Sequence, residues 1–402
     1  MQGSFSVALL METTAQLSLP PEILDLIVDH LQYETTTLKA CCLVSKSWVP
    51  QTRKHLFARV EFHALQHPVK LWKKAFPDPS SSPAHHTRTL CIRDLPTLTA
   101  ADMDVGGWIR SFHSVVHLRL ERIIWQGRWA PLIPFHGLAP TIRSLRLTST
   151  SFEVFDLICS FPLLEDLALV LLTTGDADGW TAPSTSPKLT GSLELIMNTG
   201  GICSVVRRLL DFPDGLRFME IAVSCIGKED ARSTTDLVLR CFDTLEALAI
   251  CGTPAGGFVQ LLSLANTLSP VVDSGMLPGQ PLLDLSKATK LKVLTFLCRR
   301  LRIKLIIVAL QTVESKNLRQ ITIRLYTVTT REPIEETVLQ EWLDLDRLLV
   351  RFWTSHSIHP RLMYKSDEGW KDMRDQTQSL LPELTRRGLI DLVGYTLPLV
   401  VQ

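Results

Sequence analysis

The sequence lacks a surplus of charge of either sign, because 42 Lys and Arg residues are balanced by 41 Asp and Glu residues for a net charge of +1. A protein that binds nucleic acid through a strongly basic surface needs a cationic excess, so the composition argues against that class. A disordered chain would hold fewer apolar residues than the 46% found here. We therefore expect a folded protein with no nucleic acid among its partners.

Signals for secretion and membrane insertion are also missing. The nine cysteines form no C-x-x-C pair, and the chain has no Asn-x-Ser/Thr sequon. An odd number of cysteines without that spacing indicates neither a disulfide framework nor a zinc ribbon. The first sixteen residues lack the basic segment of a signal peptide, and glycines and prolines interrupt the longest uncharged stretch, residues 247–272. We expect an intracellular protein, cytoplasmic or nuclear, with no membrane partner.

No catalytic or cofactor-binding motif stands out. The sequence contains no P-loop, no dinucleotide-binding glycine motif and no nucleophile elbow. The pairs His85-His86 and His356/His359 have neither the i, i+4 spacing nor the neighbouring carboxylates of a metal site. Cys298 is followed by four cations, a pattern better explained by a strand end and a solvated helix face than by a reactive thiol. We expect no enzyme activity, no cofactor and no metal.

Leucine is in excess, with 67 of 402 residues. Much of it lies in a recurring pattern, apolar-x-x-apolar-x-apolar, whose clear copies begin at Val115, Ile142, Leu164 and Leu245. Weaker copies begin at Thr87, Thr190, Leu216, Leu291 and Leu318. Successive starts are 28, 27, 22, 26, 26, 29, 46 and 27 residues apart. Because 46 is near two periods, we expect one degraded copy between Gly252 and Pro281.

A period in the twenties with Leu-x-x-Leu-x-Leu is typical of leucine-rich repeats. In each copy two alternating apolar residues of a short strand point to the core, and stretches such as 152–158 and 203–212 between copies have a helical pattern. One such unit cannot bury its apolar face alone, so stacked units share a continuous core. Only Asn198 occupies a position where such repeats often carry Asn, so we expect divergent repeats. A globular α/β domain with coincidental leucine spacing is the alternative.

The segment before the repeats predicts three short helices. The first follows Leu19-Pro20-Pro21-Glu22 and has an apolar stripe that begins at Ile23. Residues 35–37 are suited to cap a second helix, and Pro50 suits the first turn of a third. A unit of about 45 residues is too small to be comfortably stable alone, so it would gain by docking on a partner.

Two elements of this segment, Leu-Pro-Pro-Glu-Ile-Leu at 19–24 and Leu-Lys-Ala-Cys-Cys-Leu-Val-Ser-Lys-Ser-Trp at 38–48, together resemble the F-box motif of large fungal F-box families. The resemblance implies a three-helix module that binds a Skp-type adaptor within a cullin–RING ubiquitin ligase. Position by position, the implied adaptor contacts are Leu19, Pro20, Ile23, Leu24, Ile27, Leu31, Leu43, Val44 and Trp48. A helix-turn-helix DNA binder is the competing three-helix interpretation, but the Lys and Arg residues here are nearly matched by Asp and Glu.

The predicted fold class is α/β, a three-helix F-box followed by a leucine-rich-repeat-like solenoid with one short parallel strand per repeat. The predicted domains are an F-box at 17–62, a helical connector with a Pro/Ser-rich linker at 63–86, and a divergent leucine-rich-repeat domain at 87–402. Apolar helical patterns at 335–350 and 366–387 predict a helical C-terminal cap over the last repeat.

Residues that flank the inward leucines would face the concave side of a repeat array, where such proteins concentrate their contact area. The predicted target-binding residues are His117, Arg119, Glu121, Arg146, Asp166, Glu194, Glu220 and Arg324. With the resemblance, they imply a non-catalytic substrate-recognition adaptor of a Skp–cullin–F-box ubiquitin ligase, which binds an unidentified target protein. The alternative is an interaction scaffold without ubiquitin-ligase turnover.

Overall fold

The computed structural model describes residues 20–63, 66–78, 81–95, 109–123, 133–149, 154–170, 186–196, 202–213, 215–224, 228–251, 283–298, 303–325, 336–365, 375, 377–389 and 391–395. Within these ranges no helix combines the length and the apolar character needed to cross a bilayer.

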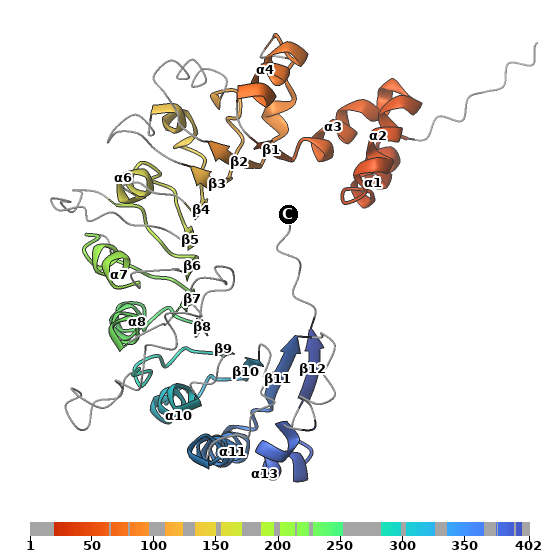
Figure 1. The fold of residues 1–402 in the computed structure, drawn as a ribbon. Coiled ribbons are helices and arrows are strands. Elements are labelled where there is room, and N and C mark those ends of the chain that lie inside the picture. Colours follow the sequence, from red (N-terminus) through yellow and green to blue (C-terminus); the bar gives the residue numbers. More distant parts are fainter. Residues whose placement is uncertain are drawn as a thin grey trace, which may run out of the picture.

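The strands form a single twelve-stranded sheet in which they lie side by side in chain order and every pair is parallel. They are β1 (Arg59–His63), β2 (Thr89–Leu95), β3 (His117–Ile123), β4 (Ser144–Thr148), β5 (Asp166–Val170), β6 (Ser192–Ile196), β7 (Glu220–Ser224), β8 (Ala247–Cys251), β9 (Val293–Cys298), β10 (Gln320–Leu325), β11 (Pro360–Lys365) and β12 (Asp391–Tyr395). The helices on the outer side of the sheet are α6 (Val154–Cys159), α7 (Cys203–Leu210), α8 (Lys228–Arg240), α10 (Ile303–Thr312) and α11 (Glu336–His356). Figure 1 shows an arc with the strands inside and these helices outside.

All nine predicted copies of the leucine pattern form strands, β2 to β10. In β4, Leu145 and Leu147 are buried, whereas the alternate residues Ser144 and Arg146 are partly exposed. The same alternation recurs along the sheet, so the inward side chains of neighbouring strands stack into one core with the helices. Each fully buried leucine contributes about 1.5–3 kcal/mol, which explains why the pattern is kept through so many units.

Many neighbouring units are joined by a repeated hydrogen-bond arrangement at the start of their strands. The Ala58 carbonyl, just before β1, accepts the backbone N–H groups of Arg88 and Thr89 at 2.8 and 3.0 Å. The Glu246 carbonyl before β8 does the same for Lys292 and Val293, at 2.7 and 3.1 Å. This second case joins β8 directly to β9 across the longest gap between copies.

The expectation of a degraded copy between Gly252 and Pro281 falls on residues 252–282, which lie outside the described residues. The two strands on either side of this segment, β8 and β9, pair directly with each other in the sheet.

The C-terminal end differs from the predicted helical cap. The first predicted helix is present as α11 and runs six residues further, to His356. The chain then returns to the sheet as β11, forms the short helix α13 (Pro382–Arg386), and ends its described part with β12. Pairing with the open edge of β10 explains these strands, because that edge offers unsatisfied backbone groups to any extended segment that reaches it.

Buried carboxylates cap helices across neighbouring elements. Asp346 of α11, 2% exposed, accepts the backbone N–H groups of Glu383 and Leu384 at 2.8 and 3.0 Å, at the start of α13. Asp230 of α8 accepts the Ile202 N–H at 2.8 Å, where α7 begins. These bonds satisfy helix N-terminal donors that have no partner in their own helix.

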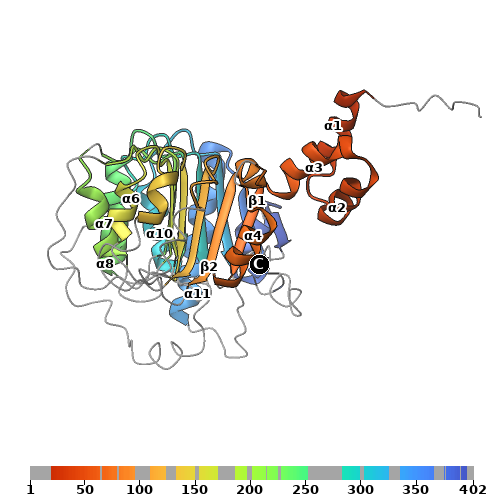
Figure 2. The same cartoon turned by 90° about the horizontal axis from the view of Figure 1, so that it is seen from above.

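The N-terminal segment forms the three predicted helices, α1 (Pro21–His30), α2 (Thr35–Val44) and α3 (Val49–Leu56). Their small interior includes Val28, Leu38 and Cys41. β1 follows within the range predicted for the module, and the connector contains α4 (Gln66–Ala75) and the short 3-10 helix η2 (Pro83–His86). Seen from above, α1 to α3 project away from the strand array (Figure 2).

Candidate functional site

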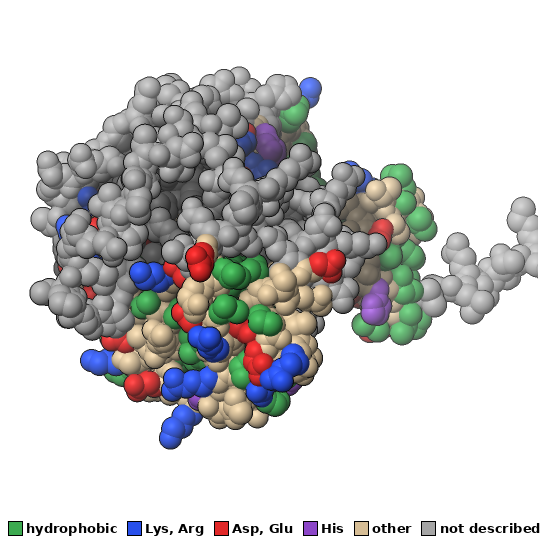
Figure 3. Space-filling model, turned by 60° about the horizontal axis from the view of Figure 1, so that its bottom comes forward, with side chains coloured by type: hydrophobic (Ala, Val, Ile, Leu, Met, Phe, Trp, Pro, Cys, Tyr) green, Lys and Arg blue, Asp and Glu red, His purple; other side chains and the backbone are tan. Residues whose placement is uncertain are grey.

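The N-terminal module exposes a group of large apolar side chains, which we call the apolar face. It consists of Ile23, Leu26 and Ile27 of α1 and Leu43 and Val44 of α2, exposed by 43%, 56%, 37%, 88% and 70%. Figure 3 shows hydrophobic side chains on the outer side of the module, at the right. Single exposed apolar side chains are common on protein surfaces, but five large ones within about twenty consecutive residues make a candidate interaction surface.

Helix α1 is apolar on two sides. Val28 is buried against the module interior, with Leu24 and Leu31 partly buried beside it. Ile23 and Ile27 lie on the other side and are exposed. A surface helix normally has one apolar stripe that faces the core, so the exposed apolar residues on a second side of α1 make that side the candidate docking surface.

The predicted adaptor contacts fall into three groups. Pro20, Ile23, Ile27, Leu43 and Val44 are exposed. The partly buried ones are Leu24, Leu31 and Trp48. Leu19 lies outside the described residues. Sequence reasoning missed Leu26, although it lies three residues after Ile23, a spacing that places two helical residues on one side.

A polar cluster holds α1 against α3. Asp29 Oδ1 lies 2.6 Å from His55 Nε2 and accepts a hydrogen bond from Gln51 Nε2 at 2.5 Å. The hydrogen bond from His55 lowers the pKa of Asp29 below its ordinary value, against the opposing effect of burial. The carboxylate form of Asp29 therefore supports the angle at which α1 presents its apolar face.

The eight predicted target-binding residues all lie at outward positions of the sheet. His117, Arg119 and Glu121 alternate along β3, with Leu118 and Leu120 buried between them. The others are Arg146 on β4, Asp166 on β5, Glu194 on β6, Glu220 on β7 and Arg324 on β10. The register places Arg119 beside Arg146, and Ala168 lies between Arg146 and Glu194 in the same row.

Arg146 and Glu194 are brought together across an intervening strand. Arg146 Nη1 donates to Glu194 Oε2 at 2.6 Å, although β5 lies between their strands. The side chain at that place on β5 is Ala168, which is small enough to leave the space above it open. Both partners are about one-third exposed, so the pair forms part of the accessible face.

Asp166 has a structural contact that the sequence did not reveal. Its Oδ1 accepts the Ser192 N–H at 2.7 Å and the Ser192 hydroxyl at 2.9 Å, which ties β5 to β6. Gly191 lies directly against this carboxylate, where a Cβ would overlap it. Asp166 is therefore engaged within the sheet.

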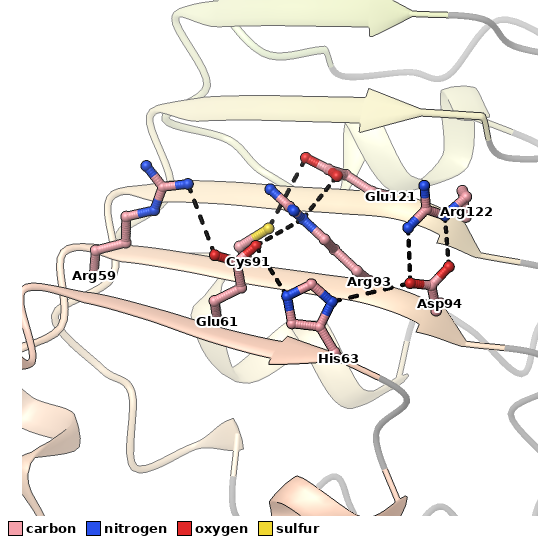
Figure 4. A network of polar contacts seen from close by, with 8 residues as sticks. All are labelled: Arg59, Glu61, His63, Cys91, Arg93, Asp94, Glu121 and Arg122. Carbon is pink, nitrogen blue, oxygen red and sulfur yellow. Dashed lines mark hydrogen bonds and ion pairs between the residues drawn. The ribbon is translucent and has the colours of Figure 1, made fainter. Parts of the chain in front are cut away.

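A network of charged residues on β1, β2 and β3 contains Glu121, a predicted target-binding residue, but its other members were not predicted (Figure 4). Arg93 Nε lies 2.7 Å from Glu61 Oε1 and 2.8 Å from Glu121 Oε2, so one guanidinium links three strands. These contacts are ion pairs without the alignment of N–H···O hydrogen bonds. Burial raises the pKa of the adjacent Cys91 thiol, and the carboxylate of Glu121 adds to the increase.

A second charge pair marks a repeated backbone turn. Asp94 and Arg122 have φ of 54° and 52°, and Ser149 one repeat later has 50°, so equivalent strand ends take the left-handed conformation. Arg122 donates two hydrogen bonds to Asp94, at 2.5 and 2.8 Å, and these bonds lower the pKa of Asp94. Left-handed backbone is unfavourable for residues with a Cβ, and this pair compensates at two of the three positions.

Within the described ranges, no group of three His, Cys, Asp or Glu side chains converges to hold a metal ion. Burial raises the pKa of Cys159 to about 12 and those of Cys241 and Cys251 to about 11. Thiols with such pKa values are protonated at neutral pH and are poor nucleophiles. Cys298, the thiol considered from sequence, ends β9.

No protein-family model and no curated protein matches the chain. The fold agrees with a leucine-rich-repeat-like arrangement, in which each parallel strand is followed by a helix or loop.

Proposed function

We propose that the chain is a substrate-recognition adaptor of a Skp–cullin–F-box ubiquitin ligase. In this proposal residues 17–62 act as an F-box and bind a Skp-type adaptor, while a solenoid of divergent leucine-rich repeats binds a target protein. The observation that carries the proposal is the apolar face of Ile23, Leu26, Ile27, Leu43 and Val44, exposed on a small helical module. Its position supports the proposal because the module projects from the sheet and leaves room for a partner (Figure 2).

The two elements of the F-box resemblance support the same surface. Residues 19–24 lead into α1, and residues 38–48 span most of α2 and the turn to α3. Each element supplies part of the apolar face, Ile23 from the first and Leu43 with Val44 from the second. An adaptor that contacts both would bury the outer sides of α1 and α2 together.

Target recognition is proposed for the concave side of the sheet. Its N-terminal half presents polar and charged residues, including His117, Arg119 and the Arg146–Glu194 pair. Among the described residues, the middle row over β7 to β9 instead holds Ala222, Ala249 and Thr295. A target with a charged part followed by a neutral part would match this division.

The mechanism in this proposal is proximity. A target held on the repeats and an adaptor held on α1 and α2 are joined by one chain, so the target stays at high effective concentration near the ligase. The chain itself would contribute no active site, and it would act in the cytoplasm or nucleus.

A binding experiment with a purified Skp-type adaptor tests the proposal. We expect the wild-type chain to co-purify with the adaptor and the double variant Leu19→Ala, Pro20→Ala to lose it. Leu163→Ala, which changes a leucine 46% exposed outside the module, is the matched control and should bind normally. Failure of the wild-type chain to bind, or equal binding by the double variant, would contradict the F-box assignment.

The target side requires a separate measurement. Partners captured by the full chain should show a longer half-life in cells that lack it. Captured partners with an unchanged half-life would favour the scaffold alternative instead.

A further inference from the structure

A pocket of about 200 Å³ lies where α3 meets η2 and the start of β2. We call it the junction pocket, and its lining residues are Lys54, His55, Ala58, His85, His86 and Arg88. A single water needs only about 10–15 Å³ on the same measure, so the space accepts a polyatomic ligand. The lining residues include five basic side chains and no carboxylate.

The positive charges of the junction pocket act on one another. Burial lowers the pKa of His86, and the charges of His85, Arg53 and Lys54 lower it further. Arg88 adds a second permanent cation to the lining, where it makes one long hydrogen bond, 3.4 Å, to the Ser114 carbonyl. Mutual repulsion of this kind is relieved when an anion binds.

The histidines have nitrogen atoms left over for a ligand. His85 Nδ1 lies 2.8 Å from the Ser82 carbonyl and must donate to it, because a carbonyl oxygen only accepts, so Nε2 remains available. The His85 and His86 rings are in contact, with centroids 3.8 Å apart. Asp29 is the carboxylate that contacts His55 of the pocket lining. Its Oδ1 is engaged by His55 Nε2 and Gln51 Nε2.

The charges select the kind of ligand. A metal cation would be repelled by Lys54 and Arg88, whereas a phosphate group offers several acceptor oxygens and up to two negative charges. Lys54 belongs to the N-terminal module and Arg88 to the segment that enters β2. One anion between them would join the two parts of the chain.

We propose that the junction pocket binds a phosphate-type dianion through Lys54, Arg88 and a protonated His86. The bound anion would link α3 to the segment that enters β2, next to the hydrogen bonds that the Ala58 carbonyl accepts from Arg88 and Thr89. This proposal is independent of the identity of any adaptor or target.

Calorimetric titration of the full chain with inorganic phosphate at pH 7 tests the site. We expect saturable one-to-one binding, weakened about tenfold or more in the double variant Lys54→Gln, Arg88→Gln, since each removed contact is charge-assisted. The double variant Lys316→Gln, Arg319→Gln, which removes two exposed cations elsewhere, is the charge-matched control and should bind as wild type. Thermal unfolding without phosphate verifies that all variants are folded.

A pH series with sulfate isolates the role of His86, because sulfate keeps its charge between pH 8 and pH 6. Binding that requires a protonated imidazole should be at least about threefold tighter at pH 6 than at pH 8. His86→Gln should remove this dependence while Lys316→Gln keeps it. A sulfate affinity with the same pH dependence in wild type and His86→Gln would contradict the role assigned to that histidine.

The source of the phosphate is decided by a third titration, with a short end-blocked peptide that contains one phosphoserine. Binding at least as tight as that of inorganic phosphate assigns the pocket to a phosphorylated side chain, and clearly weaker binding assigns it to the free ion. The proposal is overturned if inorganic phosphate shows no saturable binding to wild type, or if the Lys54→Gln, Arg88→Gln variant binds it equally well.

Discussion

Helix α2 offers two leucines with opposite environments, and their truncation separates folding from docking. Leu43 is 88% exposed and Leu38 is 1% exposed, although they lie only five residues apart. The perturbation is the same in each case, Leu→Ala, so the chemistry removed is identical. We expect Leu43→Ala to weaken adaptor binding without changing stability, and Leu38→Ala to destabilise the module.

The magnitudes follow from the exposed fractions. Leu→Ala removes three carbons, worth about 2.4 kcal/mol when fully buried at about 0.8 kcal/mol per carbon. If the adaptor covers the 88% of Leu43 that is now exposed, the loss is about 2 kcal/mol, or about thirtyfold in Kd. Leu38→Ala instead opens a cavity in the module interior and costs about 2–5 kcal/mol of unfolding free energy.

The assay combines adaptor binding by calorimetry with unfolding followed by circular dichroism. Leu43→Ala should show the weaker binding with an unchanged unfolding midpoint, and Leu38→Ala should lower the midpoint. The reasoning is refuted if Leu43→Ala binds the adaptor as tightly as wild type. It is equally refuted if Leu43→Ala lowers the midpoint as much as Leu38→Ala, because the side chain would then belong to the core.

Three further predictions concern the repeats. Gly191→Ala should cost about 1–3 kcal/mol in urea unfolding, because the new Cβ displaces the Asp166 carboxylate from Ser192, and the cost should shrink in an Asp166→Ala background. Asp346→Ala should cost about 1–3 kcal/mol in the same assay, since it leaves two amides at the start of α13 without an acceptor. Cys241, whose pKa burial raises to about 11, should resist iodoacetamide at pH 8 until the protein is unfolded. The unfolded thiol loses its proton from about pH 8.5, so the stability contributed by Cys241 should be present below that pH and decline towards pH 11. Cys241→Ala should reduce this alkaline decline, and an unchanged urea midpoint profile in that variant would contradict the assignment.

The repeat array could be predicted because its energetic basis is local in sequence. Two inward apolar side chains per strand, such as Leu145 and Leu147, give an alternation that is visible without any long-range information. The regular spacing then places the strands in chain order. Spacing alone did not predict that β8 and β9 pair directly, although their leucine copies begin 46 residues apart.

The candidate sites were only partly predictable, since they depend on contacts between distant positions. Arg146 was expected on the concave face, but its partner Glu194 is 48 residues away and is reachable only because Ala168 lies between them. Asp166 was predicted to bind a target, and the structure adds a contact that the sequence did not reveal, because this side chain also joins β5 to β6. On α1, the predicted apolar stripe did not include Leu26, which is exposed.

The first strand shows why the sheet begins earlier than the leucine pattern. β1 reads Arg-Val-Glu-Phe-His, in which Val60 and Phe62 are buried, so it has the alternation of a strand without leucine. As the first strand of the sheet it has one unpaired edge, which in a flat apolar strand would invite pairing with another chain. Its outward residues, Arg59, Glu61 and His63, are polar, and Glu61 is drawn into the Arg93 network. The leucine signature is absent because the two inward positions hold Val60 and Phe62 instead of Leu, so β1 keeps the alternation of a strand without the residue type that defines the repeat pattern.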